Sequence, residues 1–293
     1  SDGVHEVVGP MSLICSGFAP VTDIEKTKTP LIQGDDSTLI AIDLGYCRLA
    51  GSIACEVTSQ IGDLPPDVAP KELRACFDLL QKLNSTGRLL AYHDRSDGGL
   101  LATVAEMLFA SRMGLKAQTP RGLDPIAFWF NEEAGCVFEV ANADVVAVLD
   151  QCADLTLPAY VLGEPDRTQI LTIISNGSVI LEESRIVLER SWTAVSLAMA
   201  GLRDNPSCVK EESLKIEHET KGLAATVIPE AIRIAGKRRS EDRRPSVAIL
   251  REQGVNGQIE MAYAFNYCGF EAIDVHMSDL MSGRQTLESF DAL

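Results

Sequence analysis

The sequence predicts an α/β protein with α+β character, built in two parts. Short β-rich runs alternate with segments of helical spacing between residues 11 and 203, which is typical of a compact α/β domain. Asn176-Gly177 separates two β-rich runs and is a strong hairpin signal. Near the end, a β run, a helical segment and a second β run at residues 246–275 indicate the opening of a βαβ unit.

The composition is that of a folded, acidic protein. The 293 residues suffice for two domains, and 46% hydrophobic against 23% charged residues can form a sizeable core. The 26 Lys and Arg against 42 acidic residues give a formal net charge of -16. This sign disfavours nucleic acid and anionic membranes as partners. It does not exclude a small phosphorylated ligand, which needs only local N–H groups, a few cations and a metal ion.

The cysteines and the termini point to a reducing compartment. Eight cysteines are scattered along the chain without a C-x-x-C pair, which argues against a zinc site. No basic start with an apolar run resembles a signal peptide, and no stretch approaches the ~20 apolar residues of a membrane span. We therefore expect a cytoplasmic protein with free thiols.

The first domain begins with two predicted strands, at residues 11–19 and 37–43, which are separated by a polar stretch. Apolar residues at helical spacing predict a helix over residues 70–83, and a strand at 88–92 follows. The loop 93–99 comes next. It leads into a helix whose apolar residues share one face, namely Leu100, Leu101, Val104, Met107 and Leu108.

The domain continues with a strand at residues 136–140 and a helix for which Asp144 is the expected N-cap. A hairpin follows, from residues 169–174 to 178–181. A long helix is then predicted from residue 184 to 203, ended by Asp204-Asn205-Pro206. Its candidate buried positions are Ile186, Trp192, Val195, Met199 and Leu202.

The charged residues at 204–245 predict a connecting segment with at most one short helix, and its basic cluster at 237–244 is expected to be a solvated linker or a docking surface. Beyond it, we expect strands at 246–250 and 271–275, a helix at 257–268, and Gly269 at the C′ position. Residues 246–293 cannot cover both faces of a parallel sheet. This last domain is therefore expected to be truncated, or completed by another polypeptide.

The loop His93–Gly99 is the most informative candidate site. A carboxylate at a strand end, Asp94, can bind Mg²⁺ together with substrate phosphates. The Ser96 hydroxyl and the N–H groups at Gly98-Gly99 can contact phosphate oxygens. The alternative is an ordinary strand-to-helix turn in which Asp97 caps the helix and the glycines allow tight packing.

Three further places in the sequence are candidate functional sites. Residues 131–133, Asn-Glu-Glu, could present a carboxylate to a metal or nucleotide, although a solvated acidic turn is the simpler interpretation. His93 could be a general base or a hydrogen-bonded structural residue. Residues 251–256 follow a strand and precede a helix, where α/β proteins place active-site loops. An ordinary loop with Asn256 as the N-cap is the alternative.

Five segments in order resemble the large-type phosphoribosylformylglycinamidine synthase family (FGAM synthase, formylglycinamide ribonucleotide amidotransferase). They are Leu90-Ala-Tyr-His-Asp-Arg-Ser-Asp-Gly-Gly-Leu-Leu101, Asn131-Glu-Glu-Ala-Gly135, Leu202-Arg-Asp-Asn-Pro206, Val247-Ala-Ile-Leu-Arg-Glu-Gln-Gly-Val-Asn256 and Ala272-Ile-Asp-Val-His-Met-Ser-Asp279. The resemblance spans essentially the whole chain. It implies an aminoimidazole ribonucleotide synthetase C-terminal-type domain of the second synthetase half at 1–203, a connector at 204–245, and the first βαβ of a class I, flavodoxin-like glutaminase domain at 246–293.

The resemblance also implies a function. The family is an ATP- and glutamine-dependent ligase of purine biosynthesis that converts formylglycinamide ribonucleotide into its amidine. By similarity, Asp94 matches a Mg²⁺ ligand and Ser96 a nucleotide-binding position. The nucleotide is ATP or ADP, and the site is the catalytic one or an auxiliary one that retains ADP as a structural ligand.

The departures from the family pattern imply that this chain is inactive alone. A class I glutaminase needs a cysteine on a strand-to-helix turn with a later His and Glu, and the chain ends before such a turn. No catalytic residue is therefore assigned, and Cys268, at a predicted helix end, is not the nucleophile. The expected partners are the remaining domains of the same synthase, namely the N-terminal synthetase domains and the glutaminase domain. The alternatives are a separate nucleotide-binding or scaffolding subunit that completes partner domains, or a relative of selenophosphate synthetase or thiamine-monophosphate kinase.

Overall fold

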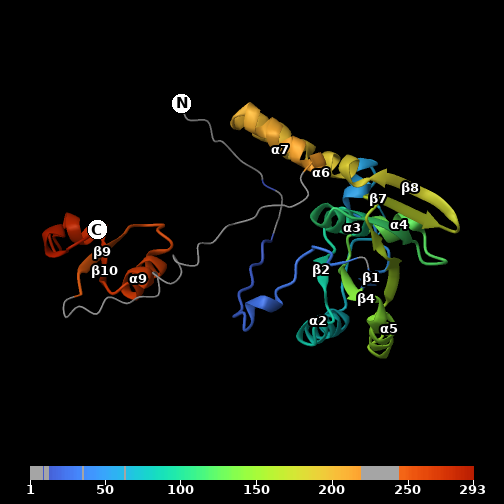
Figure 1. Cartoon of the computed structure of the whole chain (residues 1–293), viewed down its shortest axis with the longest axis horizontal. Helices are drawn as coiled ribbons and strands as arrows, with labels where there is room; N and C mark the ends of the chain where they lie inside the picture. Colours follow the sequence, from blue (N-terminus) through green and yellow to red (C-terminus); the bar gives the residue numbers. More distant parts are fainter. Residues whose placement is uncertain (1–8, 10–12, 35, 63, 219–243) are drawn as a thin grey trace. The chain divides into compact units, whose positions relative to one another are not determined.

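The computed structural model describes residues 9, 13–34, 36–62, 64–218 and 244–293. The chain divides into two compact units, Ser1–Thr220 and Lys221–Leu293, and each is a mixed α/β structure, as predicted (Figure 1). Among the described residues, no helix combines the length and the apolar character that a membrane crossing requires.

The first unit contains two four-stranded sheets. The first sheet has the order β2-β4-β1-β5 and the second has the order β6-β3-β7-β8. The strands are β1 (Ser37–Asp43), β2 (Ala91–Asp94), β3 (Gly114–Gln118), β4 (Gly135–Ala141), β5 (Ala159–Gly163), β6 (Pro165–Asp166), β7 (Ile170–Ser175) and β8 (Ser178–Ser184). The helices are η1 (Ile24–Lys26), α1 (Ile53–Val57), α2 (Pro70–Ser85), α3 (Gly99–Ser111), α4 (Pro125–Phe130), η2 (Asn142–Asp144), α5 (Val145–Asp154), α6 (Arg185–Arg203) and α7 (Pro206–His218).

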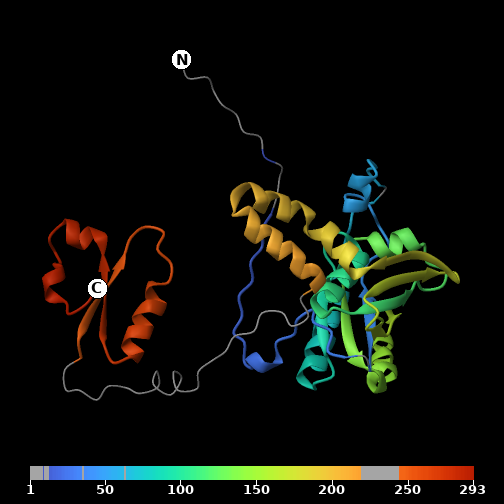
Figure 2. The ribbon, with the colours of Figure 1, turned by 45° about the horizontal axis from the view of Figure 1, so that its top comes forward.

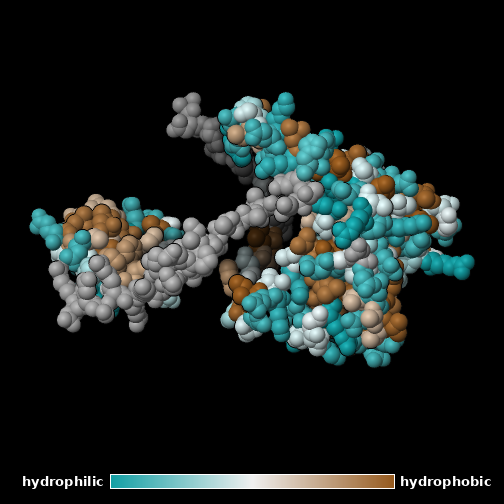
Figure 3. Space-filling model, in the orientation of Figure 1, coloured by the Kyte–Doolittle hydropathy of each residue, from teal (hydrophilic) through white to brown (hydrophobic). Residues whose placement is uncertain are grey.

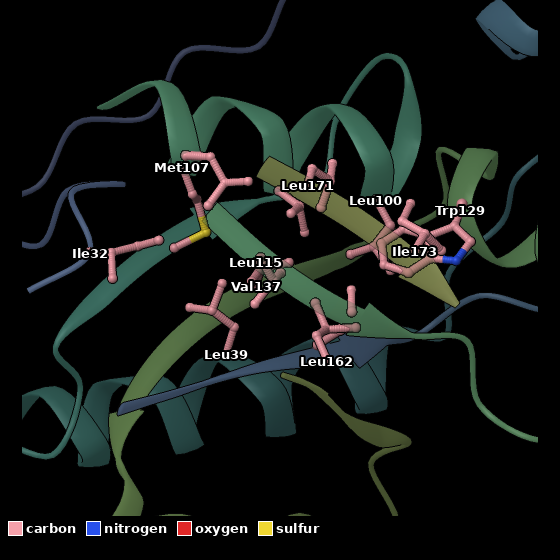
Figure 4. Close-up of a cluster of buried hydrophobic side chains, with 14 of the residues drawn as sticks. Ile32, Leu39, Leu100, Met107, Leu115, Trp129, Val137, Leu162, Leu171 and Ile173 are labelled. Atoms are coloured by element: carbon pink, nitrogen blue, oxygen red, sulfur yellow. The ribbon is translucent and has the colours of Figure 1, made fainter. Parts of the chain in front are cut away.

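Strand β1 lies between two hydrophobic cores, and all seven of its residues are buried. Because strand side chains alternate between faces, Leu39 and Ala41 enter one core and Ile40 and Ile42 enter the other. The first core joins α3 to both sheets (Figure 4). The second core joins the opposite face of the first sheet to α2 and α5, which lie together on that side in Figure 1.

Several predicted elements of this unit are confirmed. Helix α3 buries Leu100, Val104, Met107 and Leu108, and Leu101 is partly buried. Strands β7 and β8 form the predicted antiparallel hairpin, with positive φ at Asn176 and Gly177, the conformation that a two-residue hairpin turn requires. Asp144 occupies the N-cap of α5 as expected, although its side chain makes no capping hydrogen bond.

Two predictions about strands in this unit are wrong. Residues 13–19 form no strand, and Met11 lies outside the described residues. The side chains of Leu13, Ile14 and Phe18 are exposed, so this β-rich run has no partner strand in the described part of the chain. The strand predicted at 88–92 is shifted to Ala91–Asp94, where it pairs with β4.

Helix α6 has the predicted bounds, but the residues predicted to be buried on it are not. Trp192, Val195, Met199 and Leu202 are exposed, and Ile186 is intermediate, because α6 packs along α7 and contacts α3 without being covered by the core of the unit (Figure 2). The buried anchor is Arg185, whose guanidinium donates to the Ile216 carbonyl of α7 at 3.0 Å. Helix α7 is longer than the short helix expected in the connector. Residues 219–243, with most of the basic cluster 237–244, lie outside the described residues.

The second unit contains the predicted βαβ arrangement. It comprises β9 (Ser246–Arg251), α9 (Gln258–Tyr267), β10 (Glu271–His276), α10 (Met277–Met281) and η3 (Leu287–Ser289). β9 and β10 pair in parallel, and Gly269 follows α9 with a φ of 95°, as expected of a C′ glycine. The unit exposes many large apolar side chains, and Figure 3 shows a broad hydrophobic area on it.

Candidate functional site at the end of strand β2

Asp94 and Ser96 lie together at the carboxyl end of β2. Asp94 is the last residue of the strand and pairs with Cys136 of β4. Its side chain is 66% exposed, so a ligand can reach the carboxylate. The Ser96 hydroxyl donates to Asp94 Oδ2 over 3.0 Å. The structure therefore brings the two sequence-predicted residues into one exposed polar group.

The two glycines of the loop allow it to pass close to α4. Gly98 and Gly99 have φ values of 84° and 72°, in the left-handed region that favours glycine. A Cβ on Gly99 would lie 2.7 Å from the carbonyl carbon of Phe130, so a larger residue would collide. Gly98 itself is the N-cap of α3 and no side chain caps the helix. The interpretation of Asp97 as the cap is therefore wrong, whereas the tight glycine packing is confirmed.

Arg95 fixes the loop from inside the protein. Its guanidinium is almost fully buried and donates to Asp43 Oδ1 at 2.6 Å and to the Glu133 carbonyl at 2.6 Å. Its backbone N–H donates to the carbonyl of Gly135 at 2.9 Å. Arg95 thus ties the loop to the ends of β1 and β4. The sequence gives only a weak signal for this role: a charged residue within a polar loop, and an aspartate, Asp43, at the end of a distant apolar strand.

The acidic residues before β4 have structural partners. Glu133 is buried, and its carboxylate accepts from the Tyr46 and Arg48 backbone N–H groups at 2.6 and 3.0 Å and from the Arg48 side chain. The interpretation of this segment as a solvated turn is therefore wrong. Glu132 Oε1 accepts from the N–H groups of Gly98 and Ile53 at 2.8 and 2.9 Å. These carboxylates hold backbone in place around the Asp94–Ser96 loop.

His93 is a hydrogen-bonded structural residue, in agreement with the simpler interpretation. Its Nε2 lies 2.7 Å from Glu106 Oε2 on α3. Its Nδ1 lies 3.7 Å from Asp94 Oδ1, beyond hydrogen-bond distance. The ring therefore sits between the candidate ligand carboxylate and a second carboxylate.

The neighbouring thiol of Cys47 is in an acidic environment. Burial, followed by the charges of Asp43 and Glu133, raises the pKa of Cys47. Burial and the Asp43 charge likewise raise the pKa of Tyr160. Because only the thiolate is an effective nucleophile, Cys47 is a poor candidate for covalent chemistry.

The donor set fits a shared rather than a complete magnesium site. Within the described residues, no group of three or more His, Cys, Asp and Glu side chains could hold a metal ion. Asp94 offers one exposed carboxylate. Proteins commonly bind Mg²⁺ through one or two carboxylates, with substrate phosphates and water completing the shell. The residues present can therefore supply one side of such a site.

Comparison with known families finds a match to a segment of each unit. Residues 49–175 match the family described as AIR synthase related protein, C-terminal domain. Residues 244–293 match the family described as CobB/CobQ-like glutamine amidotransferase domain. The chain thus carries, in this order, a segment similar to the C-terminal domain of AIR synthase related proteins and a segment similar to a CobB/CobQ-like glutamine amidotransferase domain.

Solved structures similar to this chain come from Thermotoga maritima and Escherichia coli. PurL of T. maritima complexed with FGAR has a TM-score of 0.50 at 10% identity, and the match covers 56% of this chain and 30% of that one. PurLQS of T. maritima has a TM-score of 0.45 at 12% identity, with 85% and 34% covered. E. coli HypE, a hydrogenase maturation protein, has a TM-score of 0.40 at 20% identity, with 54% and 52% covered. At these identities the likeness concerns the fold, and the chain spans about a third of the T. maritima proteins.

In the second unit Arg251 is the last residue of β9, and residues 252–256 of the predicted loop 251–256 lie between β9 and α9. Val255 and Asn256 line a hollow of about 570 Å³ together with residues of β9 and α9 and with Leu293. The N-cap of α9 is Gly257, without a side-chain cap, so the expectation that Asn256 caps this helix is wrong. Cys268 follows α9 and is exposed.

Proposed function

We propose that this chain is part of a ligase that uses ATP and glutamine to convert formylglycinamide ribonucleotide into formylglycinamidine ribonucleotide. Residues 1–203 would be the C-terminal-type domain of a synthetase half, 204–245 a connector, and 246–293 the opening of a glutaminase domain. The two family matches, which fall in this order along the chain, support the proposal. The remaining synthetase and glutaminase domains would be its partners, and its eight free cysteines suit the cytoplasm.

In this proposal the Asp94–Ser96 loop supplies one side of a Mg²⁺–nucleotide site. Asp94 would be a metal ligand, Mg²⁺ would neutralise charge on the nucleotide phosphates, and Ser96 would donate to a phosphate oxygen. The observation that carries this assignment is the exposed Asp94 carboxylate at a strand end, 3.0 Å from the Ser96 hydroxyl. The ligand would be ATP or ADP. A retained ADP at an auxiliary site would stabilise the fold, because it binds only the folded state.

Binding of ADP with Mg²⁺ to the 293-residue chain, measured by calorimetry, tests the assignment. We expect Asp94→Asn to weaken Mg²⁺-dependent binding by about 10-fold or more, since a ligand carboxylate is lost. Ser96→Ala should weaken it by about 10-fold, the effect of one hydrogen bond to a charged group. Asp97→Asn is the matched control, because Asp97 is an exposed carboxylate on the same loop.

We also propose that the chain alone does not catalyse the reaction. The purified chain should form no amidine from formylglycinamide ribonucleotide, ATP and glutamine, because no glutaminase nucleophile has been assigned in it. Turnover that scales with the concentration of the chain would contradict this. Absence of Mg²⁺-dependent ADP binding by the unmodified chain, or equal losses in Asp94→Asn and Asp97→Asn, would contradict the site assignment.

A further inference from the structure

A row of polar side chains leads from helix α6 to the Asp94 carboxylate. Trp192 of α6 donates its indole Nε1–H to Glu106 Oε1 of α3 at 2.9 Å. Glu106 Oε2 lies 2.7 Å from His93 Nε2 of β2, and His93 Nδ1 lies 3.7 Å from Asp94 Oδ1. Helix α6, which is distant in sequence, thus joins the consecutive elements β2 and α3 in one row, which ends at the candidate metal ligand.

The hydrogen-bonding capacity of each group fixes its orientation. An indole nitrogen can only donate, so Trp192 occupies one oxygen of Glu106. The other Glu106 oxygen lies 2.7 Å from His93 Nε2 and accepts from it in the Nε2–H tautomer, a contact that sets the plane of the imidazole ring. In this tautomer Nδ1 carries a lone pair and makes no hydrogen bond to Asp94 Oδ1, 3.7 Å away, so the ring restricts the position of that oxygen by contact alone, while Ser96 donates to Asp94 Oδ2. The Asp94 carboxylate is therefore flanked at both oxygens.

Burial and packing keep this row in place. The side chains of His93 and Glu106 are 18% and 30% exposed, so water competes only partly for their hydrogen bond. Trp192 is 61% exposed, yet its ring packs on Phe109 of α3 with centroids 5.9 Å apart. The indole is thus fixed on α3 by a ring contact and by a hydrogen bond, although it contributes little to the core.

We propose that His93 is a positioning residue for the Asp94 carboxylate, held by Glu106 and Trp192, and that helix α6 is thereby coupled to ligand binding at Asp94. The inference rests on the proposed function of the Asp94–Ser96 loop. Carboxylates and histidines behind a metal ligand orient it, and their loss typically lowers metal affinity. Coupling between two sites is reciprocal, so a ligand at Asp94 should also change the environment of Trp192.

Two measurements on the 293-residue chain test this coupling: the affinity for ADP with Mg²⁺ and the tryptophan emission. Trp192→Phe removes the indole donor but keeps a ring against Phe109. His93→Ala removes the positioning group, whereas His93→Gln retains an N–H donor for Glu106. We expect His93→Ala to weaken ADP binding by about 10-fold, Trp192→Phe to weaken it by a smaller factor, and His93→Gln to restore most of the affinity.

The emission measurement separates positioning from simple stability. The chain has two tryptophans, and Trp129 is buried in the core with its Nε1 bonded to Thr119 at 2.9 Å. ADP with Mg²⁺ should therefore change the emission of the unmodified chain but not that of Trp192→Phe. If the contacts of Trp192 and His93 only stabilised the fold, their substitution would change the midpoint of unfolding. The affinity for ADP with Mg²⁺ and the change in emission on ligand binding would then stay the same.

The results separate the coupling of α6 to Asp94 from the existence of the nucleotide site at Asp94 and Ser96. If the unmodified chain binds ADP with Mg²⁺ while Trp192→Phe and His93→Ala bind equally well, the coupling is refuted and the site stands. If the unmodified chain does not bind, the proposed site fails and the coupling fails with it. Should His93→Ala not fold, Trp192→Phe still decides, because Trp192 is largely exposed.

Discussion

Replacement of Arg95 by methionine should destabilise the first unit strongly. Arg95→Met keeps most of the side-chain volume but leaves Asp43, which is 5% exposed, without its guanidinium partner. The carbonyls of Glu133 and Ala134 also lose a donor. Breaking a buried pair from one side costs about 3–5 kcal/mol. For a unit of this size, that loss corresponds to a fall in Tm of about 6–20 °C.

Urea denaturation followed by tryptophan emission measures this loss. Both tryptophans, Trp129 and Trp192, lie in the first unit, so the emission reports this unit alone. Arg74→Met is the matched control, because Arg74 pairs with Asp78 on the surface of α2, where the two side chains are 77% and 57% exposed. An exposed pair contributes about 0–1 kcal/mol. The control should therefore change little.

A double-mutant cycle with Asp43→Asn tests whether the pair, rather than the size of the side chain, carries the effect. The combined loss in Arg95→Met/Asp43→Asn should be smaller than the sum of the single losses by about 1 kcal/mol or more, since the two groups are in contact. Additive losses, or an Arg95→Met loss no larger than that of Arg74→Met, would refute the interpretation of Arg95 as the internal anchor of the loop.

Two further predictions concern the same unit. Gly99→Ala should lower the free energy of unfolding by about 1–3 kcal/mol more than Gly87→Ala, because both glycines have positive φ but only Gly99 would bring its Cβ within 2.7 Å of backbone. Equal losses in the two variants, measured by urea denaturation, would show that the close approach to α4 is unimportant. Raising the pH from 8 to 10 should destabilise the unit by about 1 kcal/mol through Cys152, whose pKa is raised by burial from 9.0 to about 11. Between these two pKa values the unfolded state releases a proton that the folded state retains, so the free energy of unfolding falls as the pH rises. Cys152→Val should reduce the slope of the free energy of unfolding against pH. An unchanged slope would show that Cys152 does not cause the pH dependence.

The sequence predicted most elements whose partners are close along the chain. The hairpin at Asn176-Gly177 and the βαβ unit depend on local turn chemistry and on hydrophobic spacing, and both are confirmed. The predicted strand at residues 11–19 failed because β-rich composition does not provide a partner strand. The apolar positions of α6 failed for a related reason, because helical spacing identifies a face but not what covers it.

At the candidate site, the sequence predicted the exposed residues better than the buried ones that support them. Asp94 and Ser96 stand at a recognisable strand end, and their proximity follows from the loop. Arg95 and Glu133 depend on partners far away in sequence, Asp43 and Arg48, which no local pattern specifies. The hydrogen bond between Trp192 and Glu106 likewise joins two helices that are distant in sequence, α6 and α3. Helical spacing had indicated a buried position for Trp192, whereas the structure places it at the surface.

The distribution of free thiols gives the protein built-in attachment points for spectroscopic labels. Cys55, Cys76, Cys136 and Cys152 are buried, whereas Cys15, Cys208 and Cys268 are exposed. Burial protects a thiol from alkylating reagents, and the raised pKa of Cys47 slows its reaction as well. After Cys15→Ser, a donor and an acceptor dye would attach mainly to Cys208 of α7 and to Cys268 after α9. Energy transfer between these dyes would then measure the separation of the two units in solution, and its change on addition of nucleotide.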